Sequence, residues 1–177
     1  MKGFTPDLFD RLLGLPVRNG VIATRLTLDE LKDAVARDLE ALLNTRSTVQ
    51  EGVLAAYPEC KTSMVSYGLC DFADRSLSSP TDRAAICASI ENAIKCHEPR
   101  LRDAKAALEL RPDSINRLDF SISALLVASR SEEPVNFDAV LTPSTLQYSI
   151  RSGAARKGAR AAASGAPLHA ATTTTGA

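Results

Sequence analysis

Apolar residues in the first third of the chain recur at steps of three and four, the spacing of a helix that buries one face. The residues that keep this spacing are Leu28, Leu31, Val35, Leu39 and Leu42. Thr27 precedes them and Glu30 follows Thr27 by three positions, which is the arrangement of a capping box. The pattern predicts a long helix that begins after Thr27 and ends near Asn44.

A second long helix is predicted after Ser79. This residue is a favourable N-cap, Pro80 suits the first helical position, and Asp82 suits the helix dipole. The helix should end before Pro99, which cannot continue it. Its apolar stripe consists of Ile86, Ile90, Ala93, Ile94 and His97.

A short segment between Pro6 and Gly14 also has helical spacing. Its apolar residues are Leu8, Phe9, Leu12 and Leu13. About two turns of helix are marginal in water, so this segment is expected to dock on something larger. Between the two long helices, an apolar stretch around Gly68 has no clear period and is expected to be an ordered loop packed on the core. Its large residues are Met64, Val65, Tyr67, Leu69 and Phe72.

Beyond Pro99 the apolar period changes to two, which indicates strands with one buried face. Strands are predicted over 118–126 and 135–141, joined by a polar turn over 130–134, with a further short strand over 146–150. The run 101–110 is ambiguous, because its apolar residues alternate while its alanine content favours helix. Helices followed by strands predict an α+β domain in which N-terminal helices pack on a mostly antiparallel C-terminal sheet.

Composition narrows the class of protein. The chain has 177 residues, of which 45% are hydrophobic, enough for one core. No apolar run approaches the length of a membrane span, and no secretory signal is visible at the start. The spacing of Cys60, Cys70, Cys87 and Cys96 matches no zinc or redox motif, so reduced and mostly buried thiols are expected. No phosphate-binding loop occurs, and no metal or cofactor is expected.

Charge and composition also set the tail apart from the body. Residues 152–177 are rich in Ala, Gly, Ser and Thr, which predicts a disordered tail. They carry Arg156, Lys157 and Arg160 but no acidic residue, so the remaining body is mildly acidic. A mildly acidic body lacks the basic footprint of a nucleic-acid-binding protein.

Four motifs together resemble one family. They are LFDRL at 8–12, RDLEALLNTR at 37–46, SYGLCDF at 66–72 and EPRL at 98–101. In this order and spacing they resemble the TssE family of type VI secretion baseplate subunits, relatives of the wedge protein encoded by gene 25 of contractile-tail phages. The resemblance covers about residues 8–150. It implies a strand after EPRL, and so assigns 101–110 to the sheet, and it implies a fold like the interlocking strand domain of the sheath.

The resemblance also implies a function. The protein would be a structural wedge component, on the cytoplasmic side of the inner membrane, with TssF, TssG and TssK as baseplate partners. It would help to initiate the TssB/TssC sheath by β-augmentation at an exposed sheet edge. We expect residues 1–20 to be a docking segment, with Phe9 and Leu12 as partner-binding residues, residues 21–151 to be the domain, and 152–177 to be the tail. Direct membrane insertion is not expected.

Two other functions remain open. Glu98, between a helix end and a sheet, is the best candidate for a general acid in a lysozyme-like enzyme, but its second carboxylate would have to come from Asp71, Asp74 or Asp103. The favoured interpretation makes Glu98, Pro99 and Arg100 a structural corner, with no catalytic residue. His97 is expected to be packed or hydrogen-bonded rather than a ligand. The other alternative is a regulatory binding module of the same fold, similar to an anti-adaptor.

Overall fold

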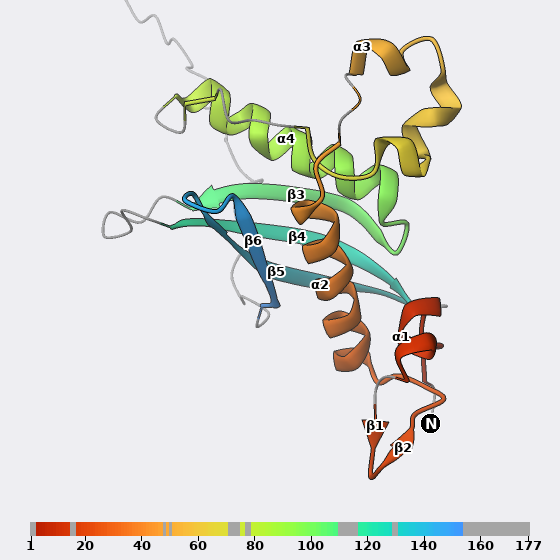
Figure 1. Cartoon of the computed structure of the whole chain (residues 1–177). Helices are drawn as coiled ribbons and strands as arrows, with labels where there is room; N and C mark the ends of the chain where they lie inside the picture. Colours follow the sequence, from red (N-terminus) through yellow and green to blue (C-terminus); the bar gives the residue numbers. More distant parts are fainter. Residues whose placement is uncertain are drawn as a thin grey trace, which may run out of the picture.

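The computed structural model describes residues 3–14, 17–47, 49, 51–70, 75–76, 79–109, 117–128 and 131–153. An N-terminal arm carries one short helix and a two-stranded hairpin, and two long helices follow with three short helical turns between them (Figure 1). These elements are α1 (Leu8–Leu13), β1 (Val17–Arg18), β2 (Val21–Ile22), α2 (Leu28–Asn44), α3 (Glu51–Leu54), η1 (Pro58–Thr62), η2 (Met64–Ser66) and α4 (Pro80–His97).

The last third of the chain forms a four-stranded antiparallel sheet in the order β3-β4-β5-β6. Its strands are β3 (Leu101–Glu109), β4 (Leu118–Ala128), β5 (Ser131–Thr142) and β6 (Gln147–Ser152). Figure 1 shows α4 running along β3 and α2 beside β6. The protein is therefore an α+β domain with N-terminal helices packed on an antiparallel sheet, as the sequence predicts.

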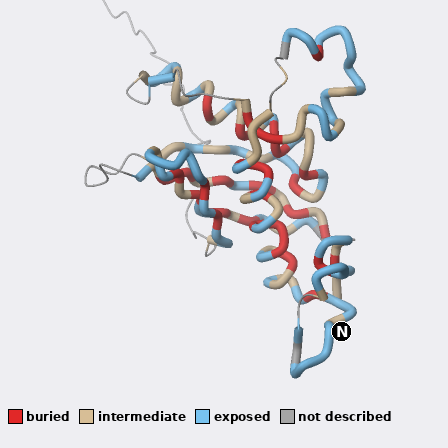
Figure 2. Tube along the Cα trace, viewed as in Figure 1, coloured by how far each residue is buried: buried red, intermediate tan, exposed pale blue. Residues whose placement is uncertain are grey.

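The core lies between these two helices and one face of the sheet, where the buried residues concentrate (Figure 2). The large side chains with less than 2% of their surface exposed include Leu39, Leu43, Ile90, Ile94, Ile122, Leu126 and Phe137. Burying a side chain of this size contributes about 1.5–3 kcal/mol relative to leaving it exposed. The apolar stripes of α2 and α4 meet the alternating strand residues here, which is why both periods are visible in the sequence.

Both predicted long helices are confirmed. At the start of α2, the Thr27 N–H donates to Glu30 Oε2 at 2.7 Å and the Glu30 N–H donates to Thr27 Oγ1 at 3.3 Å, which completes the capping box. At the start of α4, Ser79 Oγ accepts the Asp82 N–H at 3.3 Å. Two orphan backbone donors are satisfied in the first case and one in the second.

The ambiguous run is strand β3 over 101–109, as the resemblance implies and against its helix propensity. The predicted turn over 130–134 is too long, because β5 already begins at Ser131 and pairs with β4 from there. Pro134 is tolerated inside this strand. The carbonyl of Asn136 accepts a bond from Gly153 on the β6 side, so Pro134, two residues earlier, directs its missing N–H away from β4.

The middle segment differs in part from the expected packed loop. Leu69 is buried, and its backbone pairs with the segment that follows α2: its N–H donates to the Thr45 carbonyl and its carbonyl accepts from the Ser47 N–H, each at 2.9 Å. Met64 and Val65 are exposed instead, by 82% and 56%. They belong to η2, which turns away from the core, so local helical turns decide which apolar residues of this segment are buried.

Several predictions fall wholly or partly outside the described residues. Phe72 and the predicted tail from residue 154 onward lie there, while β6 itself extends to Ser152. The boundaries proposed for a docking segment, a domain and a tail stay predictions. None of the helices in the described part of the chain is long and apolar enough to cross a bilayer.

Gly68 should be needed for the pairing of Leu69. Its φ is +112°, and a Cβ atom added there would lie 2.5 Å from the Thr45 carbonyl oxygen, which is backbone and cannot move aside cheaply. Gly68→Ala is expected to lower the free energy of unfolding by at least about 2 kcal/mol, measured by urea denaturation. Gly52→Ala is the matched control, since nothing lies within 4 Å of a Cβ there, and it should be neutral or slightly stabilising. Equal effects of the two substitutions would contradict this account.

Candidate functional site

The chain turns from helix to strand within three residues at the corner between α4 and β3. The helix ends at His97, and the N–H of its C-cap, Glu98, donates to the Ile94 carbonyl at 2.8 Å. Pro99 has no N–H to continue the helix. The Leu101 N–H then donates to the Glu98 carbonyl at 3.1 Å, and the Arg100 carbonyl accepts from the Val127 N–H of β4 at 2.8 Å. Three residues thus convert a helix into an edge strand.

The Arg100 side chain joins this corner to α2. Its Nε donates to Glu98 Oε1 at 2.6 Å and its Nη2 to Glu98 Oε2 at 2.5 Å, a bidentate pair, and Nη2 also bonds to Asp38 Oδ2. Bidentate arginine pairs are among the strongest hydrogen-bonded contacts in proteins. The Glu98 side chain is 7% exposed, whereas those of Arg100 and Asp38 are 28% and 33% exposed. The corner and the middle of α2 are therefore held through one guanidinium.

Burial and charge act against each other at this cluster. Burial lowers the pKa of the Arg100 guanidinium, but the hydrogen bonds and charges of Glu98 and Asp38 outweigh burial and raise the pKa overall. Burial raises the pKa of the Asp38 carboxyl, and the opposing pull of Arg100 does not fully offset it. Glu98 adds to this rise as a second negative charge. The guanidinium thus stays charged while it balances two carboxylates.

Two aromatic rings complete the surroundings. The rings of Tyr67 and His97 meet edge to face with centroids 5.3 Å apart, and His97 Nε2 lies 3.1 Å from the Ser66 carbonyl oxygen. Burial, together with the charges of Asp38 and Glu98, raises the pKa of the Tyr67 hydroxyl. His97 is packed and hydrogen-bonded, as expected, and it ties the loop before Gly68 to the end of α4.

The geometry gives little support to acid catalysis by Glu98. Both of its carboxylate oxygens are bound by Arg100. Asp103, one of the three candidate partners, sits in an exposed bulge of β3 with φ +51°, and Asp71 and Asp74 lie outside the described residues. Glycoside hydrolysis needs two carboxylates across a sugar-sized cleft. Within the described residues, the structure does not bring such a pair together.

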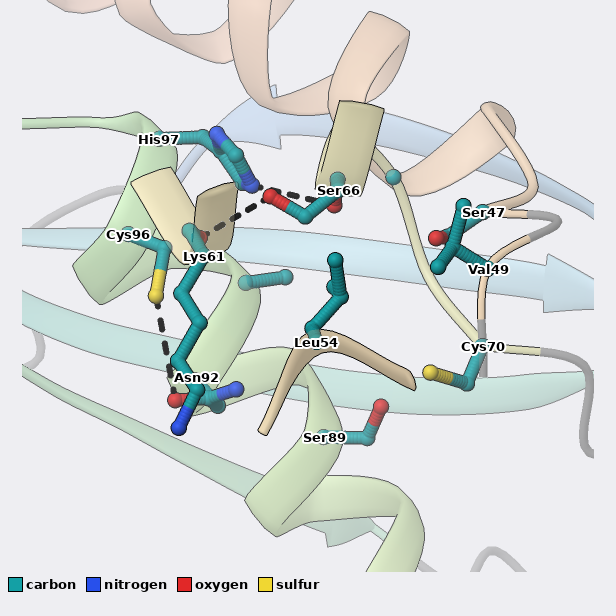
Figure 3. A pocket seen from close by; sticks show the side chains of 12 residues that line it. Ser47, Val49, Leu54, Lys61, Ser66, Cys70, Ser89, Asn92, Cys96 and His97 are labelled. Atoms are coloured by element: carbon teal, nitrogen blue, oxygen red, sulfur yellow. Dashed lines mark hydrogen bonds between the residues drawn. The ribbon is translucent and has the colours of Figure 1, made fainter. Parts of the chain in front are cut away.

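A pocket at the end of α4, lined by His97, has a different composition. It measures about 330 Å³ and lies between α4 and the segment after α2, and its lining has polar and aliphatic side chains but no carboxylate (Figure 3). The polar groups there bond to one another: the Ser66 hydroxyl lies within 3.0 Å of the Cys60 and Lys61 carbonyls, and the Cys96 thiol lies 3.9 Å from Asn92 Oδ1. Over the described part of the chain, no group of three or more His, Cys, Asp or Glu residues is placed to hold a metal ion.

The four cysteines are free thiols of intermediate burial, less buried than the sequence suggests. They come from η1, the segment after Gly68 and α4.

The N-terminal helix has its polar side inward. Asp10 is only 3% exposed, is bonded by Arg37 of α2, and accepts no hydrogen bond at Oδ2 from the described residues. The apolar residues of α1 point outward and are exposed by 66–72%: Leu8, Phe9, Leu12 and Leu13. Val17, Val21 and Ile22 of the adjoining hairpin are also more than half exposed. We call these seven residues the arm surface; it lies at one end of the molecule, with α3 at the other (Figures 1 and 2).

Sequence reasoning located the corner residues and the apolar helix but missed their partners. Asp38, Tyr67 and Asp10 were not singled out, although all three lie within the motifs that carry the family resemblance. The available signal was weak: an aspartate amid the leucines of a short helix, and another on the polar side of a long one. Only the fold shows that these carboxylates are the partners of Arg37 and Arg100.

Comparison with known proteins identifies the class. The family described as "Baseplate wedge protein gp25" matches residues 29–131, more than half of the chain. The chain belongs to this family, and it is a baseplate wedge protein of the gp25 type. The matched range contains α2 apart from its first residue, and all of α4, the corner, β3 and β4.

Two further comparisons were made. A solved structure, "The baseplate complex from the type VI secretion system", is similar over 62% of this chain and 93% of that chain, with 15% sequence identity and a TM-score of 0.41. No curated protein sequence matches the chain.

Removing the charge of Glu98 should be far more costly than removing that of an exposed glutamate in a similar pair. Glu98→Gln leaves Arg100 without its bidentate partner in a mostly buried place, and we expect the free energy of unfolding to fall by about 3 kcal/mol. Glu132→Gln is the control, because Glu132 pairs with Arg102 at 3.2 Å with both side chains more than half exposed; it should cost under about 1 kcal/mol. Urea denaturation of both variants measures the difference. A loss of unfolding free energy for Glu98→Gln as small as that for Glu132→Gln would show that the corner does not stabilise the fold.

Proposed function

We propose that this protein is the TssE-type subunit of a type VI secretion baseplate, a structural component that links the wedge to the contractile sheath and helps to initiate sheath assembly. Membership of the wedge family supports the general role. The four motifs at 8–12, 37–46, 66–72 and 98–101 favour the secretion-system branch of that family. Its partners are then the wedge proteins TssF, TssG and TssK and the sheath proteins TssB and TssC, at the cytoplasmic side of the inner membrane.

The observation that carries this proposal is the reversed orientation of α1. A helix that belonged only to its own domain would turn its leucines inward and leave Asp10 in water. Here α1 is held by a buried aspartate, while Phe9 and Leu12 are exposed by 70% and 72%. Burying each of these side chains is worth about 1.5–3 kcal/mol, and that free energy is still available in the free subunit. Large exposed apolar patches on soluble proteins mark protein interaction sites.

The corner serves as a structural element in this proposal rather than as an active site. Arg100 neutralises Glu98 and Asp38 together, and such a cluster holds two helices and a sheet in one relative orientation. A subunit that transmits position between a wedge and a sheath needs this rigidity. We therefore assign no catalytic residue to the protein.

The arm surface should be required for wedge binding but not for folding. The double variant Phe9→Ala with Leu12→Ala is expected to abolish co-purification with TssF and TssG and to leave the thermal midpoint unchanged, because both side chains are exposed. The matched control is Val53→Ala with Met64→Ala, which truncates two equally exposed apolar residues at the other end of the molecule and should leave co-purification intact. Retention of TssF and TssG by the Phe9 and Leu12 variant would refute the assignment.

The purified protein should not cleave peptidoglycan. The carboxylate of Glu98 is held by Arg100 at 2.6 and 2.5 Å, so it is not presented to a substrate. We expect no release of soluble muropeptides at any pH from 4 to 8. A standard muramidase, assayed in parallel on the same substrate, is the positive control. Cleavage that Glu98→Gln removes while the protein stays folded would establish the enzymatic alternative instead.

A further inference from the structure

The two outer strands of the sheet, β3 and β6, would normally offer unpaired backbone groups. Such edges pair readily with other chains, so proteins commonly block them. In this protein the blocking groups are helix side chains. They bond to outward-facing N–H groups of both strands and to one outward-facing carbonyl of β6.

The outer side of β6 is occupied by two residues of α2. Asn44 Oδ1 accepts the Tyr148 N–H at 2.7 Å, and Asn44 Nδ2 donates to the Tyr148 carbonyl at 2.9 Å. Glu40 Oε2 accepts the Ile150 N–H at 2.8 Å. An asparagine side chain carries the same donor and acceptor as a peptide group, so Asn44 takes the place that a residue of a fifth strand would take.

The spacing of the helix matches the spacing of the strand. Glu40 and Asn44 are four residues apart on α2, about 6 Å along the helix axis. Tyr148 and Ile150 are successive outward residues of β6, about 6.8 Å apart along the strand. One face of α2 can therefore satisfy two consecutive outward positions of β6, and we call Glu40 and Asn44 the α2 latch.

The β3 edge is closed in a parallel way by α4. Glu91 Oε1 accepts the Ala106 N–H at 3.0 Å. Further along this edge, the Leu101 N–H is taken by the Glu98 carbonyl.

The two edges differ in their regularity. Between Arg102 and Lys105 the pairing of β3 with β4 shifts register, and Asp103 has φ +51°. Such a bulge bends and twists an edge strand and opposes the addition of another strand. β6 pairs with β5 without interruption from Gln147 to Ser152. Of the two edges, β6 is the one with the regular geometry that strand addition requires.

We propose that the α2 latch keeps β6 closed in the free subunit, and that an extended segment of a sheath subunit adds to β6 once Glu40 and Asn44 have left. This inference rests on the proposed role in sheath initiation and specifies its surface. The incoming strand bonds to Tyr148 and Ile150 in place of the side chains. Neighbouring strands in a sheet lie about 4.8 Å apart, so the C-terminal part of α2 has to move away from β6 before the incoming strand can pair with it. A required rearrangement of this kind lowers the association rate constant.

The test compares association rates of the full-length protein with purified TssB–TssC complex by biolayer interferometry. Asn44→Ala removes two hydrogen bonds that must break before the strand adds, so its association rate constant should rise about tenfold, since net hydrogen-bond contributions are modest. Glu40→Ala should raise it by a smaller factor. Glu40→Gln keeps an acceptor for the Ile150 N–H and should stay near wild type.

Glu91→Ala is the matched control at the other edge, because it removes one capping bond from Ala106. It should leave the association rate unchanged. An increase with Glu91→Ala but not with Asn44→Ala would overturn the choice of β6, and no change in any variant, with sheath binding intact, would overturn the latch while leaving the proposed function in place. Failure of the wild type and all variants to bind the sheath would reject both.

Amide hydrogen exchange of the free protein provides a second readout. In Asn44→Ala the Tyr148 amide should exchange at least about tenfold faster than in wild type, because its acceptor is gone. The Ser149 amide, which lies on the side paired with β5, should keep its protection and so report that the sheet is still folded. An unchanged Tyr148 amide would show that Asn44 does not hold the edge, and would overturn the inference independently of any partner.

Discussion

One guanidinium joins the end of α4 and the start of the sheet to α2. Arg100 reaches back to Glu98 at the end of α4 and across to Asp38 on α2, from a residue whose own carbonyl is already bonded to β4. A single cation between two carboxylates on separate elements restricts both at once, and partial burial strengthens the restriction because water cannot replace either partner cheaply. The corner thus acts together with the buried side chains of α2 and α4 in holding both helices on the sheet.

The positions of the helices in turn determine what the sheet exposes. Because α2 and α4 lie along the two outer strands, their side chains reach the outward backbone groups: Glu40 and Asn44 of α2 bond to β6, and Glu91 of α4 bonds to β3. Most of the exposed large apolar residues lie elsewhere, on α1, on the β1–β2 hairpin and on the segment from α3 to η2. Backbone edges that would pair indiscriminately are covered, while side-chain surfaces, which discriminate between partners by shape, are left open. This division suits a subunit that assembles in a defined order.

Much of the fold was predictable because its signals are local. Capping at Thr27 and Ser79, the stripes of both long helices and the alternation over 118–126 depend on neighbours within a few residues, and the structure confirms each of them. The run 101–109 was not decided by local signals. Its alanines favour helix, but pairing with β4 along its length and the bonds from α4 outweigh a propensity difference of a few tenths of a kcal/mol per residue. The predicted turn before β5 was too long because Pro134 was read as part of the turn. In the structure Pro134 lies within β5, where its missing N–H faces away from β4 and removes no hydrogen bond to that strand.

By itself, the sequence determined the class of fold, the two long helices, the strand periodicity and, through four motifs in order, the family. It also singled out Glu98 and Arg100 as corner residues and Phe9 and Leu12 as candidate partner-binding residues. Only the tertiary structure decided what they contact: that Arg100 also holds Asp38, that α1 is docked through Asp10 with its leucines outward, and that Asn44 stands in for a strand beside Tyr148. These partners lie between 27 and 104 residues apart in the chain. No local pattern encodes such a pairing, since it arises only when packing of the core brings distant polar groups together out of water.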